Sequence, residues 1–146
     1  MEQNYCQELE ISPVNSDKIH EITDMELTQE LNAEEGSFLL ELRTGMHWDH
    51  TSFMNLLTGL FAYCQGVNED EQLDRSMASG IYTASVFIKS WAEHPNFPKQ
   101  QSDQYYTKSY EVLDELVEFY FTGTTAYMND EYLAEKIEHL NTMAKP

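Results

Sequence analysis

The chain has 146 residues, a length typical of one domain, and its 26 Asp and Glu residues outnumber its eight Lys and Arg residues. The resulting formal charge of −18 argues against direct binding to nucleic acid, because phosphate contacts need Lys and Arg, and against docking on anionic lipid. The chain is also 41% hydrophobic and 12% aromatic, so it can fill a core and is not expected to be disordered.

The N-terminal segment, residues 1–15, shows no apolar periodicity, so we expect an extended or flexible leader there. Residues 16–146 carry helical patterning without a linker-like break, and we expect them to form a single helical domain. A first helix is predicted from Ser16 or Asp17 to about Leu31, and the capping-box spacing of Thr23 and Glu26 leaves a later start as the alternative.

The segment after Leu31 fits two descriptions. Asn32 can cap a second helix that carries Arg43 in its last turn and ends before Gly45. Apolar residues also alternate over residues 37–43, as they do in a strand. No second strand candidate is obvious, however, and a lone strand has nothing to pair with, so the helix is the preferred prediction.

Four further helices are marked by N-capping residues, apolar stripes and clear stops. They are predicted near residues 50–65, 69–93, 103–122 and 130–144, with caps at Asp49, Asn68, Ser102 or Asp103, and Asn129 or Asp130. Gly80 lies in the apolar stripe of the second of these helices, where it would let a neighbouring helix approach closely. The sequence therefore predicts an all-α fold, a single-domain bundle of five or six helices.

The two cysteines, Cys6 and Cys64, are too few for a disulfide framework. Cys64 lies on an apolar stripe and is expected to be buried, whereas Cys6 lies in the polar leader. No apolar stretch approaches the roughly 20 residues that cross a bilayer, and residues 1–10 lack the apolar run of a secretory signal. We therefore expect a cytoplasmic protein.

His47, Asp49 and His50 lie close together in the sequence and are the candidate metal site. Two histidines three residues apart on a helix could share a face and bind a metal ion. Asp49 is better used as a helix cap, however, which would place His47 outside the helix. An ordinary polar helix start is thus the preferred interpretation, and a small metal-binding protein or enzyme is the alternative.

The motifs that mark common enzyme classes do not occur in this sequence. It has no nucleophile elbow of the Gly-x-Ser-x-Gly type and no glycine-rich phosphate loop, since its six glycines stand far apart. The paired Glu-x-x-His motifs of a di-iron bundle are also missing. We therefore expect a non-enzymatic protein without a cofactor.

Carboxylates recur at helical spacing on the sides of two predicted helices that face away from the apolar stripes. They are Glu111, Asp114, Glu115 and Glu118 in one helix and Glu131, Glu135 and Glu138 in the other. Like charges four residues apart destabilise a helix by about 0.2–0.5 kcal/mol per pair, and mixed charges would serve solubility as well. The two rows of carboxylates therefore suggest one of two roles. They form either a solvated face or a negative surface for a basic partner, and such a surface could imitate the charge density of duplex DNA.

Six of the nine tyrosines lie between Tyr105 and Tyr132, beside these carboxylates. Tyr105 and Tyr106 are adjacent on a helix and are not both expected to point into one core, and the same holds for the trio of aromatic residues at 119–121. Some aromatic surface is therefore expected to be exposed, unless the rings fill gaps between helices. Tyr106 and Tyr120 are the candidate anchors for a partner, since tyrosine is enriched at interface hot spots.

The small size, acidic charge and lack of a catalytic motif are similar in composition to bacterial toxin-immunity proteins and to phage or plasmid inhibitors of nucleases. We expect a binding protein that occludes a basic partner, such as a nuclease-like toxin or a nucleic-acid-handling enzyme. The alternatives are the metal-binding protein or enzyme described above and a structural homo-oligomer, for example a homodimer, whose aromatic patch pairs with itself.

Overall fold

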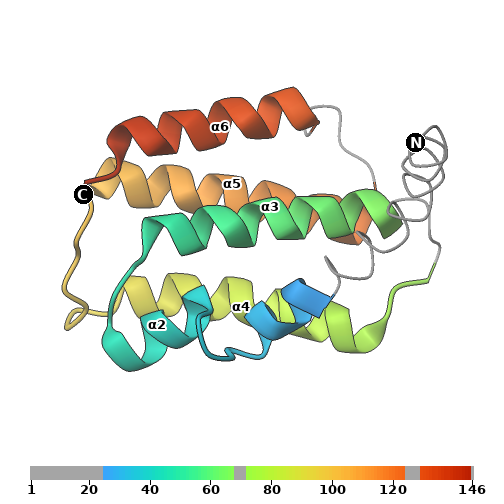
Figure 1. Cartoon of the computed structure of the whole chain (residues 1–146), viewed down its shortest axis with the longest axis horizontal. Helices are drawn as coiled ribbons and strands as arrows, with labels where there is room; N and C mark the ends of the chain where they lie inside the picture. Colours follow the sequence, from blue (N-terminus) through green and yellow to red (C-terminus); the bar gives the residue numbers. More distant parts are fainter. Residues whose placement is uncertain (1–24, 68–71, 124–128, 146) are drawn as a thin grey trace, which may run out of the picture.

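The computed structural model describes residues 25–67, 72–123 and 129–145 (Figure 1). A helical stretch over residues 25–31 precedes five helices: α2 (Phe38–Gly45), α3 (His50–Val67), α4 (Arg75–Ala92), α5 (Asp103–Thr122) and α6 (Asp130–Met143). No strand occurs in these ranges, so the predicted all-α bundle is confirmed. The predicted leader over residues 1–15, the start of the first helix and Cys6 lie outside the described residues.

Helix α5 holds the centre of the bundle, because it packs against α3, α4 and α6 (Figure 1). Helix α2 contacts α3 and α4 on the side of the molecule opposite α6 (Figure 1). None of the described helices is long and apolar enough to cross a membrane.

Three of the predicted helix starts are confirmed by side chains that bind free amides of the first turn. The Asp49 carboxylate accepts from the Ser52 amide at α3, and the Ser102 hydroxyl accepts from the Tyr105 amide at α5. At α6, the Asn129 side chain accepts from the Tyr132 amide. The predicted stop of α5 is also confirmed, since Gly123 caps it with φ of 78°, a left-handed conformation that favours glycine.

The segment after residue 31 is helical, as preferred over the strand, but its predicted start is wrong. Helix α2 begins only at Phe38, capped by Ser37 instead of Asn32. The chain first makes a turn in which Ala33 and Gly36 both have positive φ, and a helix cannot run through such residues. The Glu30 carboxylate fixes the end of this turn by accepting from the amide of Phe38 at 3.2 Å.

Helix α4 likewise begins later than predicted, at Arg75. Asp74 is its cap, and the Asp74 carboxylate accepts from the amide of Met77 at 3.0 Å. A capping residue has extended backbone angles, so the helix cannot extend back through Asp74 towards Asn68, which itself lies outside the described residues. The predicted end is confirmed, because Glu93 is the C-cap two residues before Pro95.

Gly80 permits the close approach that its place in the apolar stripe predicts. A Cβ atom built on Gly80 would lie 3.3 Å from the Cδ1 atom of Leu31, so a side chain there would press against the helical stretch over residues 25–31. The absence of a side chain at residue 80 therefore leaves room for Leu31 against α4.

The excess of carboxylates predicts a stability that depends on salt. Three lysines, Lys89, Lys99 and Lys108, form ion pairs with carboxylates in the described ranges, and the net charge of −18 is the excess that remains after all eight Lys and Arg residues are counted. Mobile ions screen the resulting repulsion, so the melting temperature should rise between low and physiological concentrations of NaCl. A flat or falling curve in a thermal scan would contradict this expectation.

Candidate functional site

The predicted carboxylate row on α5 is largely tied to the neighbouring helices and to its own helix. Glu111 pairs with Lys108 at 3.3 Å, and Asp114 pairs with Lys89 of α4. Glu115 accepts a hydrogen bond of 3.1 Å from the hydroxyl of Tyr132 on α6. Much of this row therefore helps to join α4, α5 and α6.

The remaining carboxylates of the predicted surface are exposed and belong to none of the ion pairs in the described part of the chain. They are Glu118 on α5 and Glu131, Glu135 and Glu138 on α6. On α6 they lie opposite Leu133 and Leu140, which are buried against the bundle. These four residues are called the free acidic face below.

Tyr132 borders the free acidic face and is held at its hydroxyl. Burial, the hydrogen bond to Glu115 and nearby carboxylates raise the pKa of Tyr132 to about 12. The Lys136 ammonium lies 5.0 Å from the centre of the Tyr132 ring, a cation–π contact. Tyr132 therefore remains a neutral hydrogen-bond donor at physiological pH and fixes the α5–α6 contact.

The two tyrosines predicted as partner anchors are buried, so this assignment is corrected. Tyr106 and Tyr120 have only 1% and 2% of their surface exposed. Tyr106 accepts hydrogen bonds from the backbone amides of Gln100 and Gln101, and Tyr120 stacks on Tyr63 at 6.0 Å. Tyr105, predicted not to share the core with Tyr106, is fully buried as well.

The reason lies in the number of neighbours of α5. A helix with one partner buries one stripe, whereas α5 contacts three helices and buries residues over a much wider arc. Adjacent residues such as Tyr105 and Tyr106 can then point towards different neighbours while both remain inside. The interpretation that the rings fill gaps between helices is therefore correct for Tyr106 and Tyr120.

Large apolar side chains are nevertheless exposed elsewhere. They include Tyr82 and Val86 on α4 and Phe121 on α5, with 61%, 46% and 45% of their surface accessible. Phe121 belongs to the aromatic trio at 119–121 that was expected to leave one member outside the core. Tyr82 and Val86 lie outside the predicted apolar stripe of α4, the stripe that faces the core. An apolar residue outside such a stripe is expected to be exposed, so the sequence pattern could have identified both residues as exposed.

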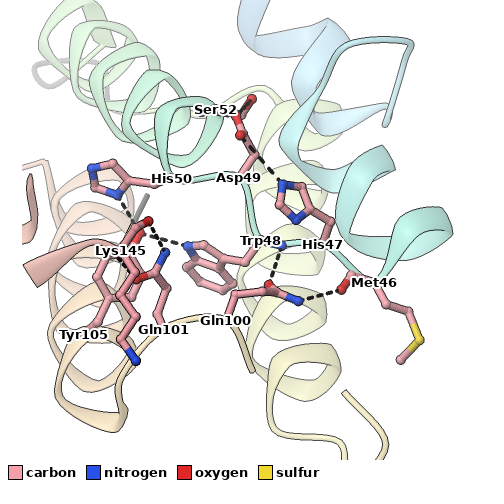
Figure 2. A network of polar contacts seen from close by, with 10 residues as sticks. All are labelled: Met46, His47, Trp48, Asp49, His50, Ser52, Gln100, Gln101, Tyr105 and Lys145. Carbon is pink, nitrogen blue, oxygen red and sulfur yellow. Dashed lines mark hydrogen bonds and ion pairs between the residues drawn. The ribbon is translucent and has the colours of Figure 1, made fainter. Parts of the chain in front are cut away.

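Trp48 and His50 belong to a hydrogen-bonded chain, and Figure 2 shows the part of it that joins them to Tyr105. The indole nitrogen of Trp48 donates to the Tyr105 hydroxyl at 2.9 Å, and that hydroxyl lies 2.7 Å from Nδ1 of His50. The Nε2 atom of His50 lies 2.6 Å from the side-chain oxygen of Asn141 on α6. Both ring nitrogens of His50 are therefore engaged by protein groups, one on α5 and one on α6.

Two consecutive glutamines complete this network (Figure 2). The Gln100 side chain accepts from the amide of Trp48 at 3.0 Å and donates to the carbonyl of Met46 at 3.2 Å. The Gln101 side chain accepts from the amide of Lys145 at 2.7 Å and donates to the carbonyl of Lys145 at 3.4 Å. The loop before α5 thus fastens both the 46–49 loop and the end of the chain.

The predicted metal residues are near one another but do not form a metal site. His47 Nε2 lies 3.8 Å from Asp49, whereas both ring nitrogens of His50 are already hydrogen-bonded to protein groups. Within the described ranges, no three His, Cys, Asp or Glu side chains are grouped so that they could hold a metal ion. A hollow of about 500 Å³ adjoins these residues, with Gln101 and Lys145 on its other wall.

Cys64 is buried, as predicted, and has the properties of a core residue. It is 1% exposed, and burial raises the pKa of its thiol to about 12. A nucleophilic cysteine needs a thiolate at neutral pH, so this thiol is chemically quiet.

The cap at Asp49 should have a pH-dependent effect on stability. Hydrogen bonds from Ser52, at 3.0 and 2.7 Å, lower the pKa of Asp49, so the folded protein favours the ionised carboxylate. Replacing Asp49 with alanine should reduce the free energy of unfolding by about 1 kcal/mol at neutral pH. This stabilisation is present above the pKa of the unfolded chain and is lost as the pH falls through the lower folded pKa.

Urea denaturation at neutral pH and near pH 3 measures both effects. Asp49→Asn is the control, because it keeps an oxygen that can cap the helix but removes the titrating group. A loss in Asp49→Ala that stays the same at both pH values would contradict the electrostatic part of the prediction.

Comparison with known proteins adds no relative from which a function could be transferred. No protein-family model, no curated protein and no solved structure matches the chain.

Proposed function

We propose that this protein is a non-enzymatic binding protein whose free acidic face docks on a basic protein and blocks it. The observation that supports the proposal is that Glu118, Glu131, Glu135 and Glu138 are exposed and engaged in none of the ion pairs of the described chain. Groups that a fold leaves unpaired remain available to the cations of a partner. The remaining carboxylates of the predicted surface are tied up by lysines and by Tyr132.

The partner is a basic protein, and a nuclease-like toxin or a nucleic-acid-handling enzyme fits best. Such a protein has a cationic groove for phosphates, and carboxylates on regularly spaced helical turns can occupy that groove in place of DNA. The class of activity would then be that of an immunity or anti-restriction inhibitor acting as a DNA mimic. Opposite electrostatic fields would speed the encounter by orders of magnitude at low salt.

The test begins with capture of a partner from the native host, followed by kinetics with the purified pair. Reversing Glu118, Glu135 and Glu138 to lysine should slow association and flatten its salt dependence. The matched control reverses three exposed carboxylates remote from this face, Glu34, Glu35 and Glu41, which produces the same change in net charge. Equal association rates and salt slopes for the two triple variants would refute the proposal.

A further inference from the structure

The seam between α4 and α5 carries an apolar patch that the bundle does not cover. Two contacts fix how the helices are aligned: the Tyr110 hydroxyl donates to Glu93 at 2.8 Å, and Lys89 pairs with Asp114. From the first pair to the second, the position on α4 falls by four residues, from Glu93 to Lys89, while the position on α5 rises by four, from Tyr110 to Asp114. The two helices are therefore antiparallel.

Two further helical turns along the same seam bring the exposed apolar residues together. Continuing this alignment places Val86 opposite Val117 and Tyr82 opposite Phe121. Tyr82, Val86 and Phe121 are three of the four large apolar side chains that are exposed in the described ranges, and Val117 is half-buried beside them. Their grouping on one seam forms the apolar patch, which consists of these four residues.

Carboxylates flank this patch on the α5 side. Glu118, which belongs to none of the ion pairs of the described residues, lies one residue from Val117, whereas Glu111 and Asp114 precede it and are paired with Lys108 and Lys89. The patch thus offers apolar contacts next to negative charge, which is complementary to a surface that combines apolar and cationic side chains.

We propose that the apolar patch on the α4–α5 seam docks an amphipathic basic helix of the partner. A third helix fits along the seam of two antiparallel helices, and its apolar side chains at every third or fourth position would contact Tyr82, Val86 and Phe121. Its cationic side chains would meet the exposed carboxylate of Glu118 on α5. This inference rests on the proposed function and supplies the aromatic anchors that the buried Tyr106 and Tyr120 do not provide.

A second copy of this chain is the competing occupant of the patch. Each copy carries a formal charge of −18, and the carboxylates beside the patch would face those of the other copy. Repulsion between like charges therefore favours a basic partner over self-association.

The experiment uses a synthetic probe helix of about 18 residues, with leucine on one face and lysine on the other. A second peptide with glutamine in place of leucine has the same charge. Fluorescence anisotropy should show tighter binding of the leucine peptide to the full chain. Tyr82→Ser and Phe121→Ser should each weaken that binding about tenfold, mainly through faster dissociation.

Met25→Ser is the matched control, because Met25 is the fourth exposed large apolar residue and lies outside the patch. It should leave peptide binding unchanged. The substituted side chains are largely or partly exposed, so thermal scans should show every variant still folded at the temperature of the binding assay. Equal binding of both peptides, or equal effects of the three serine variants, would overturn the inference.

A double reversal of Glu135 and Glu138, which lie on α6 and outside the patch, separates this inference from the proposed function. If it leaves association and salt dependence unchanged while Tyr82→Ser weakens binding, the proposed function fails and the docking patch stands. If it slows association while Tyr82→Ser has no effect, the patch fails and the acidic face stands. A dimer in sedimentation analysis that Tyr82→Ser dissociates would replace the basic helix with a second copy as the occupant.

Discussion

Replacing Trp48 with alanine should lower the free energy of unfolding by about 3–5 kcal/mol, the range for a large aromatic residue deleted from a core. Trp48 is 1% exposed and contacts Phe38, Phe53 and Tyr106 with ring centres 4.8–5.0 Å apart. These rings belong to α2, α3 and α5, so a single side chain joins three helices. Alanine would leave a cavity at their junction and remove the donor to Tyr105.

The variant Trp48→Phe separates packing from hydrogen bonding. It keeps an aromatic ring among its neighbours but removes the indole donor to the Tyr105 hydroxyl, so its loss should be smaller than that of alanine. Urea denaturation of both variants gives the comparison. A loss under about 1 kcal/mol for Trp48→Ala would show that the ring is not the centre of the core.

Local chemistry explains which parts of the fold could be predicted from the sequence. The side chains of Ser102 and Asn129 accept hydrogen bonds from amides three residues further along the chain, and Gly123 ends α5 in a left-handed conformation. These roles are local, so they follow from the residue types near each helix end. The predicted starts of α2 and α4 were wrong because more than one residue before each helix can act as its N-cap. Ser37 and Asp74 compete with Asn32 and Asn68, and the turn before α2 depends on Glu30, eight residues from its partner Phe38.

The network around Trp48 depends on contacts that no local pattern contains. His50 contacts Tyr105 and Asn141, which lie 55 and 91 residues further along the chain, and Trp48 bonds Gln100, 52 residues away. The sequence motif around His47 left a metal site as the alternative to the preferred polar helix start, because spacing alone does not show which groups a side chain contacts. In the structure, His50 instead links the start of α3 to α5 and α6.

The exposed carboxylates of the candidate surface could be predicted from the sequence, but its exposed aromatic residues could not. Exposed carboxylates follow from helical spacing, since Glu131, Glu135 and Glu138 lie opposite the apolar stripe of a helix with few buried residues. Which carboxylates are neutralised depends on neighbours such as Lys89 on another helix. Likewise, the burial of Tyr106 and the exposure of Phe121 depend on how many helices surround α5, which periodicity within one helix does not reveal.

Replacing Leu60 with alanine should lower the free energy of unfolding by about 2–5 kcal/mol, because truncation of a buried leucine loses apolar contacts and leaves a cavity. Leu60 is 3% exposed in the middle of the apolar stripe of α3, the helix that packs against both α2 and α5. Glu135→Ala is the control on the exposed side of α6 and should change stability by under about 0.5 kcal/mol. Both values come from urea denaturation at one pH and salt concentration. A larger loss for Glu135→Ala than for Leu60→Ala would mean that the carboxylates of α6 support the fold, and a surface that supports the fold would not be free to meet a partner.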